Sequence, residues 1–319
     1  MDNLHPILVV AGEPYSVFLE LFFKAKKRNK NTILIVSKKL LQMQMKSLNF
    51  DYKINELDIK KIKLDKLPKN KINIVNVDFK FKKTFDKITN KSNNYIEKCF
   101  IVALDLIKKY KFSGLINGPI SKKYFLQGKN LGITEYLAKK TKKNNNVIML
   151  IYNKKLSVSP ITTHLPLKDV HKNISKEKIY KHVKLINEFY KKKFNKKPKI
   201  AITGLNPHCE SNFHNSEEDL IIVPAINKLK KKKFLVNGPF PADTIFMKEN
   251  FKKYDVIIGM YHDQVLSPMK SLFGFDAFNI TLGLPFIRIS PDHGPNSSML
   301  GKNVSNPKSL MEALKFLDE

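Results

Sequence analysis

The sequence predicts an α/β protein built on a mostly parallel sheet. Apolar runs of strand length alternate with longer amphipathic segments along the 319 residues. Strands that alternate with helices in this order are typical of parallel sheets covered by helices. The chain is 42% apolar, an ordinary globular composition, and is long enough for one large or two medium domains with real cores.

Ten segments are predicted as strands because each is a short apolar run that ends at polar or turn residues. They cover residues 7–11, 32–36, 72–77, 114–117, 147–152, 157–163, 199–204, 234–237, 255–260 and 278–283.

Four longer amphipathic segments are predicted as helices, at residues 95–110, 176–194, 217–232 and 307–317. Acidic residues lead and lysines trail in 217–232, as the helix dipole favours. Pro307 opens the last helix, where a missing N–H costs little.

We expect two domains. The stretch GPISKKYFLQGKNLG is rich in turn residues and marks a change of domain near residues 120–130. The chain ends soon after Arg288, so its last part is expected to return to the first domain. The predicted domains are residues 1–125 with 285–319, and residues 126–284.

The net charge of +30 would fit a nucleic-acid-binding protein. Of the 58 basic residues, however, only Arg28 and Arg288 are arginine, and lysines occur in every predicted helix and loop. A nucleic-acid binder more often has clustered arginines with interleaved aromatic residues. We therefore attribute the charge to a composition bias and expect no nucleic-acid partner, although the charge would attract anionic metabolites.

The sequence is also that expected of a cytoplasmic protein without a membrane partner. It has no run of about 18 apolar residues, and its N-terminus lacks a basic region and a cleavage site. Its two cysteines, Cys99 and Cys209, are too few and too far apart for a disulfide framework.

Three histidines follow predicted strands. His164 comes after VSPITT, His208 after IAITG, and His262 after VIIGM. Ligands of open α/β sheets bind at the carboxyl ends of strands, and three neutral imidazoles can hold a divalent metal while leaving positions open for substrate. A single histidine is more often a surface or packing residue, and these spacings match no local ligand motif. The fold would therefore have to assemble the site.

Other polar residues follow strands or begin helices. Asp243, in the rigid loop GPFPADTIF, could contact a substrate or orient a histidine, or could simply cap a helix. Thr134 stands at an apparent helix start, which favours either a phosphate site or a plain cap. The planar guanidinium group of Arg288 can bind a carboxylate or phosphate through two parallel hydrogen bonds. No G-x-G-x-x-G follows the first strand, so the usual dinucleotide fingerprint is absent.

Eight segments together resemble the 4-hydroxythreonine-4-phosphate dehydrogenase family of vitamin B6 synthesis. In chain order they are GEP, GPISK, GITEYLA, TTHLPL, GLNPHCES, GPFPADTIF, MYHDQVLSPMK and FNITLGLPFIRISPDHG, spread over most of residues 12–294. The resemblance implies a fold related to isocitrate and isopropylmalate dehydrogenases, with two α/β/α domains and a cleft between them. It also implies a homodimer with the active site at the subunit interface.

The resemblance implies metal-dependent oxidation of 4-phosphooxy-L-threonine by NAD or NADP to 2-amino-3-oxo-4-phosphooxybutanoate. That product decarboxylates to 3-amino-2-oxopropyl phosphate, on the route to pyridoxine 5'-phosphate. The implied ligands of the divalent ion (Zn, Mg, Mn or Co) are His164, His208 and His262, with His262 expected from the partner subunit. The implied substrate contacts are Thr134, Lys270, Asn279 and Arg288, and the implied proton acceptor is Lys270 or Asp243.

The sequence departs from the family pattern at three places. Ile133 stands where the family usually has a histidine before the threonine, YSVFLEL replaces a glycine-rich stretch after GEP, and NPHCES lacks the usual glycines. These departures keep two alternatives open. One is a dehydrogenase of another phosphorylated hydroxy acid, such as erythronate 4-phosphate, and the other is a non-catalytic metabolite-binding protein.

Overall fold

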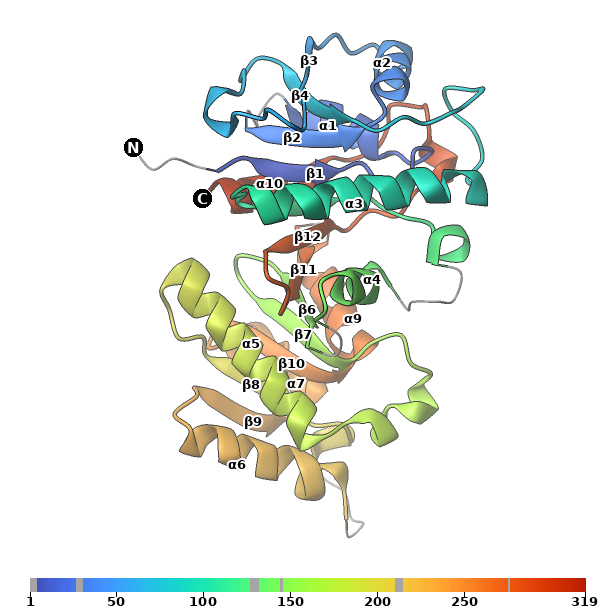
Figure 1. The fold of residues 1–319 in the computed structure, drawn as a ribbon. Helices are drawn as coiled ribbons and strands as arrows, with labels where there is room; N and C mark the ends of the chain where they lie inside the picture. The colour runs from blue at the N-terminus through green and yellow to red at the C-terminus, as the bar shows by residue number, and fades with distance from the viewer. Residues whose placement is uncertain (1–4, 27–30, 127–131, 144–145, 210–214, 275) are drawn as a thin grey trace. The chain divides into compact units, whose positions relative to one another are not determined.

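Figure 1 shows the computed structural model of the chain, which describes residues 5–26, 31–126, 132–143, 146–209, 215–274 and 276–319. Arg28, residues 127–130 of the predicted domain junction, and residues 210–214 lie outside the described part of the chain. The chain divides into two compact units, residues 1–137 with 285–319 (unit 1) and residues 138–284 (unit 2). Both units are α/β, so the predicted fold class is confirmed. The predicted first boundary lies earlier, at residue 125.

Unit 1 contains a parallel sheet with the strand order β3-β4-β2-β1-β5-β12. Strands β1 and β2 in the middle of this sheet are buried along their whole length, because helices cover both faces. Helix α3 (Asn93–Lys109) packs on one face, and α1 (Phe18–Lys26) and α10 (Lys308–Asp318) lie on the other (Figure 1). The strands are β1 (Ile7–Val10), β2 (Thr32–Val36), β3 (Ile54–Glu56), β4 (Ile72–Asn76), β5 (Gly114–Asn117) and β12 (Arg288–Pro291).

Unit 2 contains a mixed sheet with the order β11-β6-β7-β10-β8-β9. Strands β7, β10, β8 and β9 are parallel, whereas β6 runs antiparallel to β7 and β11. Helices α5 (Lys176–Phe194) and α6 (Val223–Lys231) cover one face, and α9 (His262–Phe273) packs on the other (Figure 1). The strands are β6 (Ile148–Tyr152), β7 (Ser157–Thr162), β8 (Ile200–Thr203), β9 (Val236–Phe240), β10 (Val256–Tyr261) and β11 (Phe278–Leu282).

All ten predicted strands and all four predicted helices are present, with ends that shift by a few residues. The segment predicted as one helix from residue 217 begins with a π-helical turn, η7 (Glu218–Ile222), before α6. Strands β3 and β12 were not predicted because they are short and partly polar. Helices α1, α2 (Lys38–Ser47), α4 (Ile133–Lys140), α7 (Ala242–Ile245), α8 (Lys248–Phe251) and α9 were also not predicted as such.

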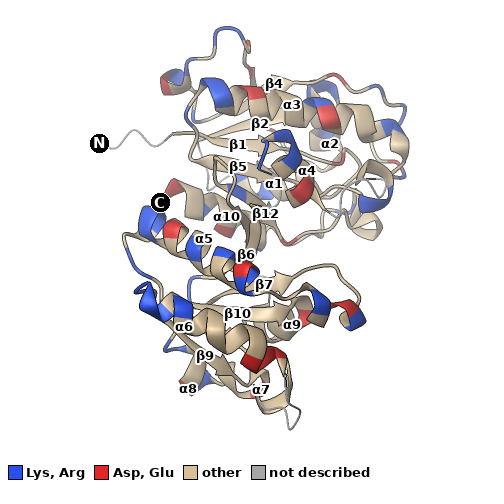
Figure 2. Cartoon of the chain, turned by 60° about the horizontal axis from the view of Figure 1, so that its bottom comes forward, with Lys and Arg blue, Asp and Glu red and all other residues tan. Residues whose placement is uncertain are grey.

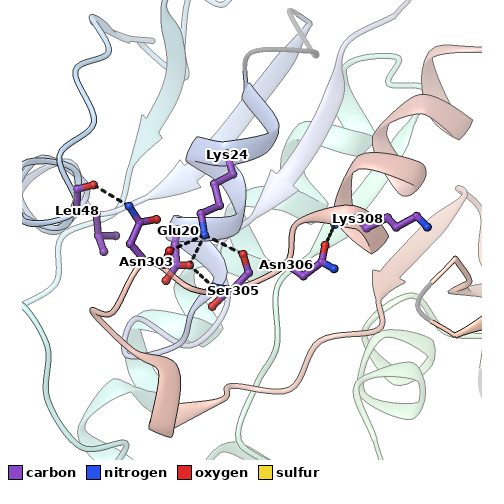
Figure 3. Close-up of polar contacts among 7 residues, drawn as sticks. All are labelled: Glu20, Lys24, Leu48, Asn303, Ser305, Asn306 and Lys308. Atoms are coloured by element: carbon purple, nitrogen blue, oxygen red, sulfur yellow. Dashed lines mark hydrogen bonds and ion pairs between the residues drawn. The ribbon is translucent and has the colours of Figure 1, made fainter.

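The segment before α10 is fastened to α1 by a buried carboxylate (Figure 3). Glu20 is 2% exposed, and its Oε1 accepts hydrogen bonds from Lys24 Nζ at 2.8 Å and from the backbone N–H of Ser305 at 2.6 Å. Lys24 also donates to the carbonyls of Asn303 and Ser305. These contacts hold the chain end that follows β12 against the helix that follows β1.

Lysines occur on helices and loops of both units, with acidic residues scattered among them (Figure 2). Among the residues described, no helix is both long enough and apolar enough to cross a membrane.

Candidate active site

Three parallel strands of unit 2 end at the same edge of its sheet. Strand β10 pairs with β7 on one side and with β8 on the other, all in parallel. His164 follows β7 by two residues, His208 lies in the turn after β8, and His262 is the first residue of α9 after β10. The topology therefore gathers at one sheet edge three histidines that are far apart in sequence.

The backbone at two of these histidines is in the left-handed region. His164 has φ of 56° and His208 has φ of 59°, and Cys209 next to it also has φ of 59°. Residues other than glycine rarely adopt this conformation, and such outliers cluster at ligand sites. The sharp turns leave both imidazoles exposed after strands whose own side chains are buried.

The separation of two imidazoles fits a shared divalent ion. The ring centroids of His164 and His262 lie 6.0 Å apart. Two imidazoles that bind one ion at about 2.1 Å have ring centroids roughly 5–6 Å apart. Nδ1 of His262 lies 2.7 Å from Oδ1 of Asp263, which leaves Nε2 for a ligand, as in many metal sites where a carboxylate orients the histidine.

Within the described part of the chain, no three His, Cys, Asp or Glu side chains are close enough together to hold an ion. The participation of His208, and the contribution of His262 by the partner subunit, stay predictions.

The other predicted residues of unit 2 lie on three elements. Lys270 is an exposed residue of α9, and partial burial of its ammonium group lowers its pKa from the ordinary value of 10.5. Asp243 is exposed in the first turn of α7 and caps no helix, because Pro241 is the N-cap of α7 and Met247 that of α8. Asn279, on β11, has a buried Oδ1 without a hydrogen-bond partner among the described residues. A polar atom in this position is suited to bind a ligand.

Unit 1 brings together two predicted substrate residues, Arg288 and Thr134. Arg288 is fully buried on β12, and its Nε donates to Oδ1 of Asn117 at 2.7 Å, while Nη1 donates to Oγ1 of Thr134 at 3.4 Å. Burial lowers the pKa of Arg288 to about 9, and the charge of Glu135 opposes that shift. Asn117 was not predicted as a site residue, although a polar residue that ends the apolar strand GLIN is a signal for such a role.

The GEP and GPISK motifs lie side by side in unit 1. The backbone N–H of Glu13 donates to the carbonyl of Pro119 at 2.9 Å. Gly12 has φ of 77°, and a Cβ there would lie 2.5 Å from that same carbonyl, so only glycine fits. Burial raises the pKa of Glu13 to about 7, against the lowering effect of a hydrogen bond from Ser92. Glu13 was not predicted as a functional residue, although it follows the first strand by three residues.

Comparison with known proteins assigns the family. The family described as "Pyridoxal phosphate biosynthetic protein PdxA" matches residues 28–317. A 4-hydroxythreonine-4-phosphate dehydrogenase of Sulfurihydrogenibium sp. is 39% identical over 97% of this chain and 96% of its own length. A provisionally named D-threonate 4-phosphate dehydrogenase of Oceanobacillus iheyensis is 31% identical over 97% of this chain and 96% of its own.

A solved structure agrees with this assignment. The crystal structure of a 4-hydroxythreonine-4-phosphate dehydrogenase from Burkholderia phymatum superposes with a TM-score of 0.82, at 27% identity, over 99% of this chain and 98% of its own. The family model, the relatives and the solved structure all match along nearly the whole sequence. The chain therefore belongs to the PdxA family of pyridoxal phosphate biosynthetic proteins.

Proposed function

We propose that this chain is a dehydrogenase that oxidises 4-phosphooxy-L-threonine with a nicotinamide cofactor, in pyridoxal phosphate biosynthesis. The observation that carries the proposal is the 39% identity, over nearly the full length of both chains, to a relative with this name. The histidines at one sheet edge of unit 2 and the Arg288–Thr134 pair in unit 1 support it.

The reaction breaks the C–H bond at C3 of the substrate, and the hydride passes to the nicotinamide ring. The C3 hydroxyl loses its proton, and 2-amino-3-oxo-4-phosphooxybutanoate is formed. A divalent ion held by His164, His208 and His262 would lower the pKa of that hydroxyl and polarise the new carbonyl. The product carries its carboxylate beta to this carbonyl, so it loses CO2 to give 3-amino-2-oxopropyl phosphate.

We propose that Lys270 or Asp243 takes up this proton. Partial burial lowers the pKa of Lys270, as suits a proton acceptor, and Asp243 is exposed in the first turn of α7. Arg288 and Thr134 would bind an anionic end of the substrate, and Asn279 would add one directional hydrogen bond through its buried amide oxygen.

A second candidate is oxidation of another phosphorylated hydroxy acid. The relative from Oceanobacillus iheyensis carries the provisional name D-threonate 4-phosphate dehydrogenase and matches the chain over the same length. Ile133, next to Thr134, provides no side-chain hydrogen bond where the family pattern has a histidine. A substrate that has a different group near this position, such as a sugar-acid phosphate, would lose less binding free energy when isoleucine replaces the histidine.

The active enzyme is proposed to be a homodimer. The resemblance implies that His262 of the partner subunit completes the metal site, whereas the 6.0 Å between the ring centroids of His164 and His262 in one chain supports a site to which that chain contributes both. NAD and NADP, and Zn, Mg, Mn and Co, are all to be tried as cofactors.

The test is nicotinamide reduction by purified, metal-loaded protein, followed at 340 nm. The protein is offered 4-phosphooxy-L-threonine, D-threonate 4-phosphate and erythronate 4-phosphate separately, each with NAD and with NADP. We expect turnover of the threonine phosphate that is lost on chelation and in His164→Ala. His171→Ala is the matched control, because His171 lies in a nearby turn of the same unit but follows no strand.

The alternatives give different results. Turnover of a sugar-acid phosphate alone would assign the second candidate function. Tight binding of substrate without reduction of either nicotinamide would leave a metabolite-binding protein and overturn the dehydrogenase assignment.

A further inference from the structure

Gln264 is two residues after His262 but, unlike its neighbours in sequence, points into the protein. A residue directly after a buried strand is expected to be exposed, as Asp263 is. Gln264 is only 8% exposed, because α9 begins at His262 and turns Gln264 back over the sheet. A buried amide must satisfy its donors and acceptors, so its partners define what it does.

The amide of Gln264 joins the exits of two strands. Its Oε1 accepts hydrogen bonds from the backbone N–H of Met260 at 2.7 Å and from Oγ1 of Thr203 at 2.9 Å. Its Nε2 donates to the carbonyl of Gly204 at 2.8 Å. Met260 lies on β10, two residues before His262, and Gly204 directly follows β8, four residues before His208.

The same chain of hydrogen bonds continues to the third strand. Oγ1 of Thr162, the last residue of β7, donates to the carbonyl of Met260 at 2.8 Å. Thr162 lies two residues before His164. Hydrogen bonds that bypass the sheet ladder thus connect the ends of all three strands that precede a predicted metal ligand.

Two glycines provide the space that this network needs. A Cβ at Gly259 would lie 2.4 Å from Cγ1 of Val265 and 3.0 Å from Oε1 of Gln264. A Cβ at Gly204 would lie 2.7 Å from Sγ of Cys209 and 2.8 Å from Oε1 of Glu218. Both positions therefore favour glycine, because any larger residue would push the first turn of α9, or the turn that carries His208, away from the sheet.

We propose that Gln264 is a positioning residue, which fixes the exit of β8 against that of β10 and so sets where His208 and His262 present their imidazoles. Gln264 does not contact the substrate or the ion in this scheme. It acts through the strand ends, as the outer partners of metal ligands generally do. The inference rests on the proposed function only in taking the three histidines as the ligands of a divalent ion.

The test measures metal binding, with Co2+ as the probe. Metal-free protein is titrated with Co2+, and the visible absorption of the bound ion gives both the affinity and the coordination geometry. For Gln264→Met, which keeps the side-chain length but makes no hydrogen bond, we expect affinity to fall by about 10- to 100-fold with a changed spectrum. Thr203→Val removes one of the three hydrogen bonds, and we expect a smaller loss in the same direction.

Ser159→Ala is the matched control. Oγ of Ser159 bonds the carbonyl of Met149 and lies 2.9 Å from Nδ1 of His182, so this variant also cuts buried hydrogen bonds of unit 2, but in the middle of β7. We expect a lower melting temperature with Co2+ affinity within about threefold of wild type. If Ser159→Ala loses as much affinity as Gln264→Met, general destabilisation explains the effect and the inference is overturned.

A double variant separates positioning from general damage. In a His208→Ala background, Gln264→Met is expected to cause a smaller further loss of Co2+ affinity than it causes alone, because one of its two targets is gone. If the losses of Co2+ affinity in the two single variants simply add in the double variant, the inference is overturned. If Gln264→Met does not fold, the same cycle is run with Thr203→Val.

The outcomes for the wild-type protein distinguish the two proposals. Wild type that binds Co2+ but oxidises none of the phosphorylated substrates contradicts the proposed function and leaves the positioning role intact. Wild type that is active and binds Co2+, while Gln264→Met binds it equally well, contradicts only the positioning role. Wild type that binds no Co2+ contradicts the metal site and with it the positioning role.

Discussion

Arg288 donates from Nε to Oδ1 of Asn117 at 2.7 Å, and both side chains are buried within unit 1. A buried guanidinium is stable only when its N–H groups have partners, because the loss of hydration is otherwise uncompensated. Asn117 ends β5 and Arg288 begins β12, so the pair also links two neighbouring strands.

Asn117→Ala is expected to lower the free energy of unfolding by about 2–3 kcal/mol, because it removes a buried hydrogen bond to a charged group. It should also raise the KM for the phosphorylated substrate more than it lowers kcat, since Arg288 would lose its orientation. Urea unfolding and steady-state kinetics provide the measurements. Asn117→Asp keeps the acceptor and is expected to retain a KM close to that of wild type, and equal KM values for wild type and Asn117→Ala would refute the proposed role.

Glu13 is expected to make the protein less stable as the pH rises. Burial raises its pKa from the ordinary 4.5 to about 7 in the folded state. Between these values the folded state holds a proton that the unfolded state has lost, so stability is fully present below pH 4.5 and is lost as the pH rises through 7. The penalty at pH 8 amounts to about 3 kcal/mol.

Glu13→Gln removes this penalty. We expect the variant to be more stable than wild type at pH 8 and similar to it at pH 5, as measured by urea unfolding at both values. Ser92→Ala removes the hydrogen bond to Oε1 of Glu13 and serves as the control, with a loss of stability at both pH values. A stability difference between wild type and Glu13→Gln that does not change with pH would contradict the raised pKa.

The backbone conformation of His208 is expected to lower the stability of the fold while it presents the imidazole to the metal site. Its φ of 59° is strained for any residue except glycine. His208→Gly and His208→Ala both remove the imidazole, but only the glycine variant relieves the backbone. We expect the glycine variant to be the more stable of the two by about 1 kcal/mol. Both variants should bind Co2+ more weakly than wild type and lose activity. Wild-type Co2+ affinity in either variant would exclude His208 as a ligand.

The buried carboxylate of Glu20 is expected to contribute far more stability than an exposed ion pair of the same length. Lys24–Glu20 and Lys38–Glu56 both span 2.8 Å, but the side chain of Glu20 is 2% exposed and that of Glu56 is 41% exposed. Glu20→Ala should lower the free energy of unfolding by about 3 kcal/mol, since it leaves the Ser305 N–H and Lys24 without their acceptor.

The matched variant Glu56→Ala should change the free energy of unfolding by less than about 1 kcal/mol. Both values come from urea unfolding at pH 7, and similar losses in the two variants would show that burial does not set the strength of the Glu20 contacts.

Ile133→His tests what this departure from the family pattern does to the choice of substrate. Ile133 is half-buried at the start of α4, next to Thr134, so a histidine at this position would remain partly exposed to solvent. A new hydrogen bond to an anionic substrate group should lower the KM for 4-phosphooxy-L-threonine by about tenfold, which corresponds to ~1.4 kcal/mol. Ile133→Asn offers a neutral control, and an unchanged KM in Ile133→His would remove this position from the substrate site.

The sequence alone determined the fold class, the ten strands and the order in which the predicted site residues follow them. These features depend on local apolar runs and on motifs such as TTHLPL and MYHDQ. Both kinds of pattern can be recognised in the linear sequence without knowledge of the fold. Strands β3 and β12 were not predicted from the sequence, because short, partly polar segments give no periodic signal.

The tertiary structure decided which strand ends are neighbours and which polar residues are buried. The pairing of β10 with both β7 and β8 puts His164, His208 and His262 at one sheet edge, although 44 and 54 residues separate them in sequence. Gln264 lies in the same short motif as His262, yet only the start of α9 turns it inward to bridge two strands. Such contacts depend on long-range pairing and on close backbone approach, which no local pattern of residues specifies.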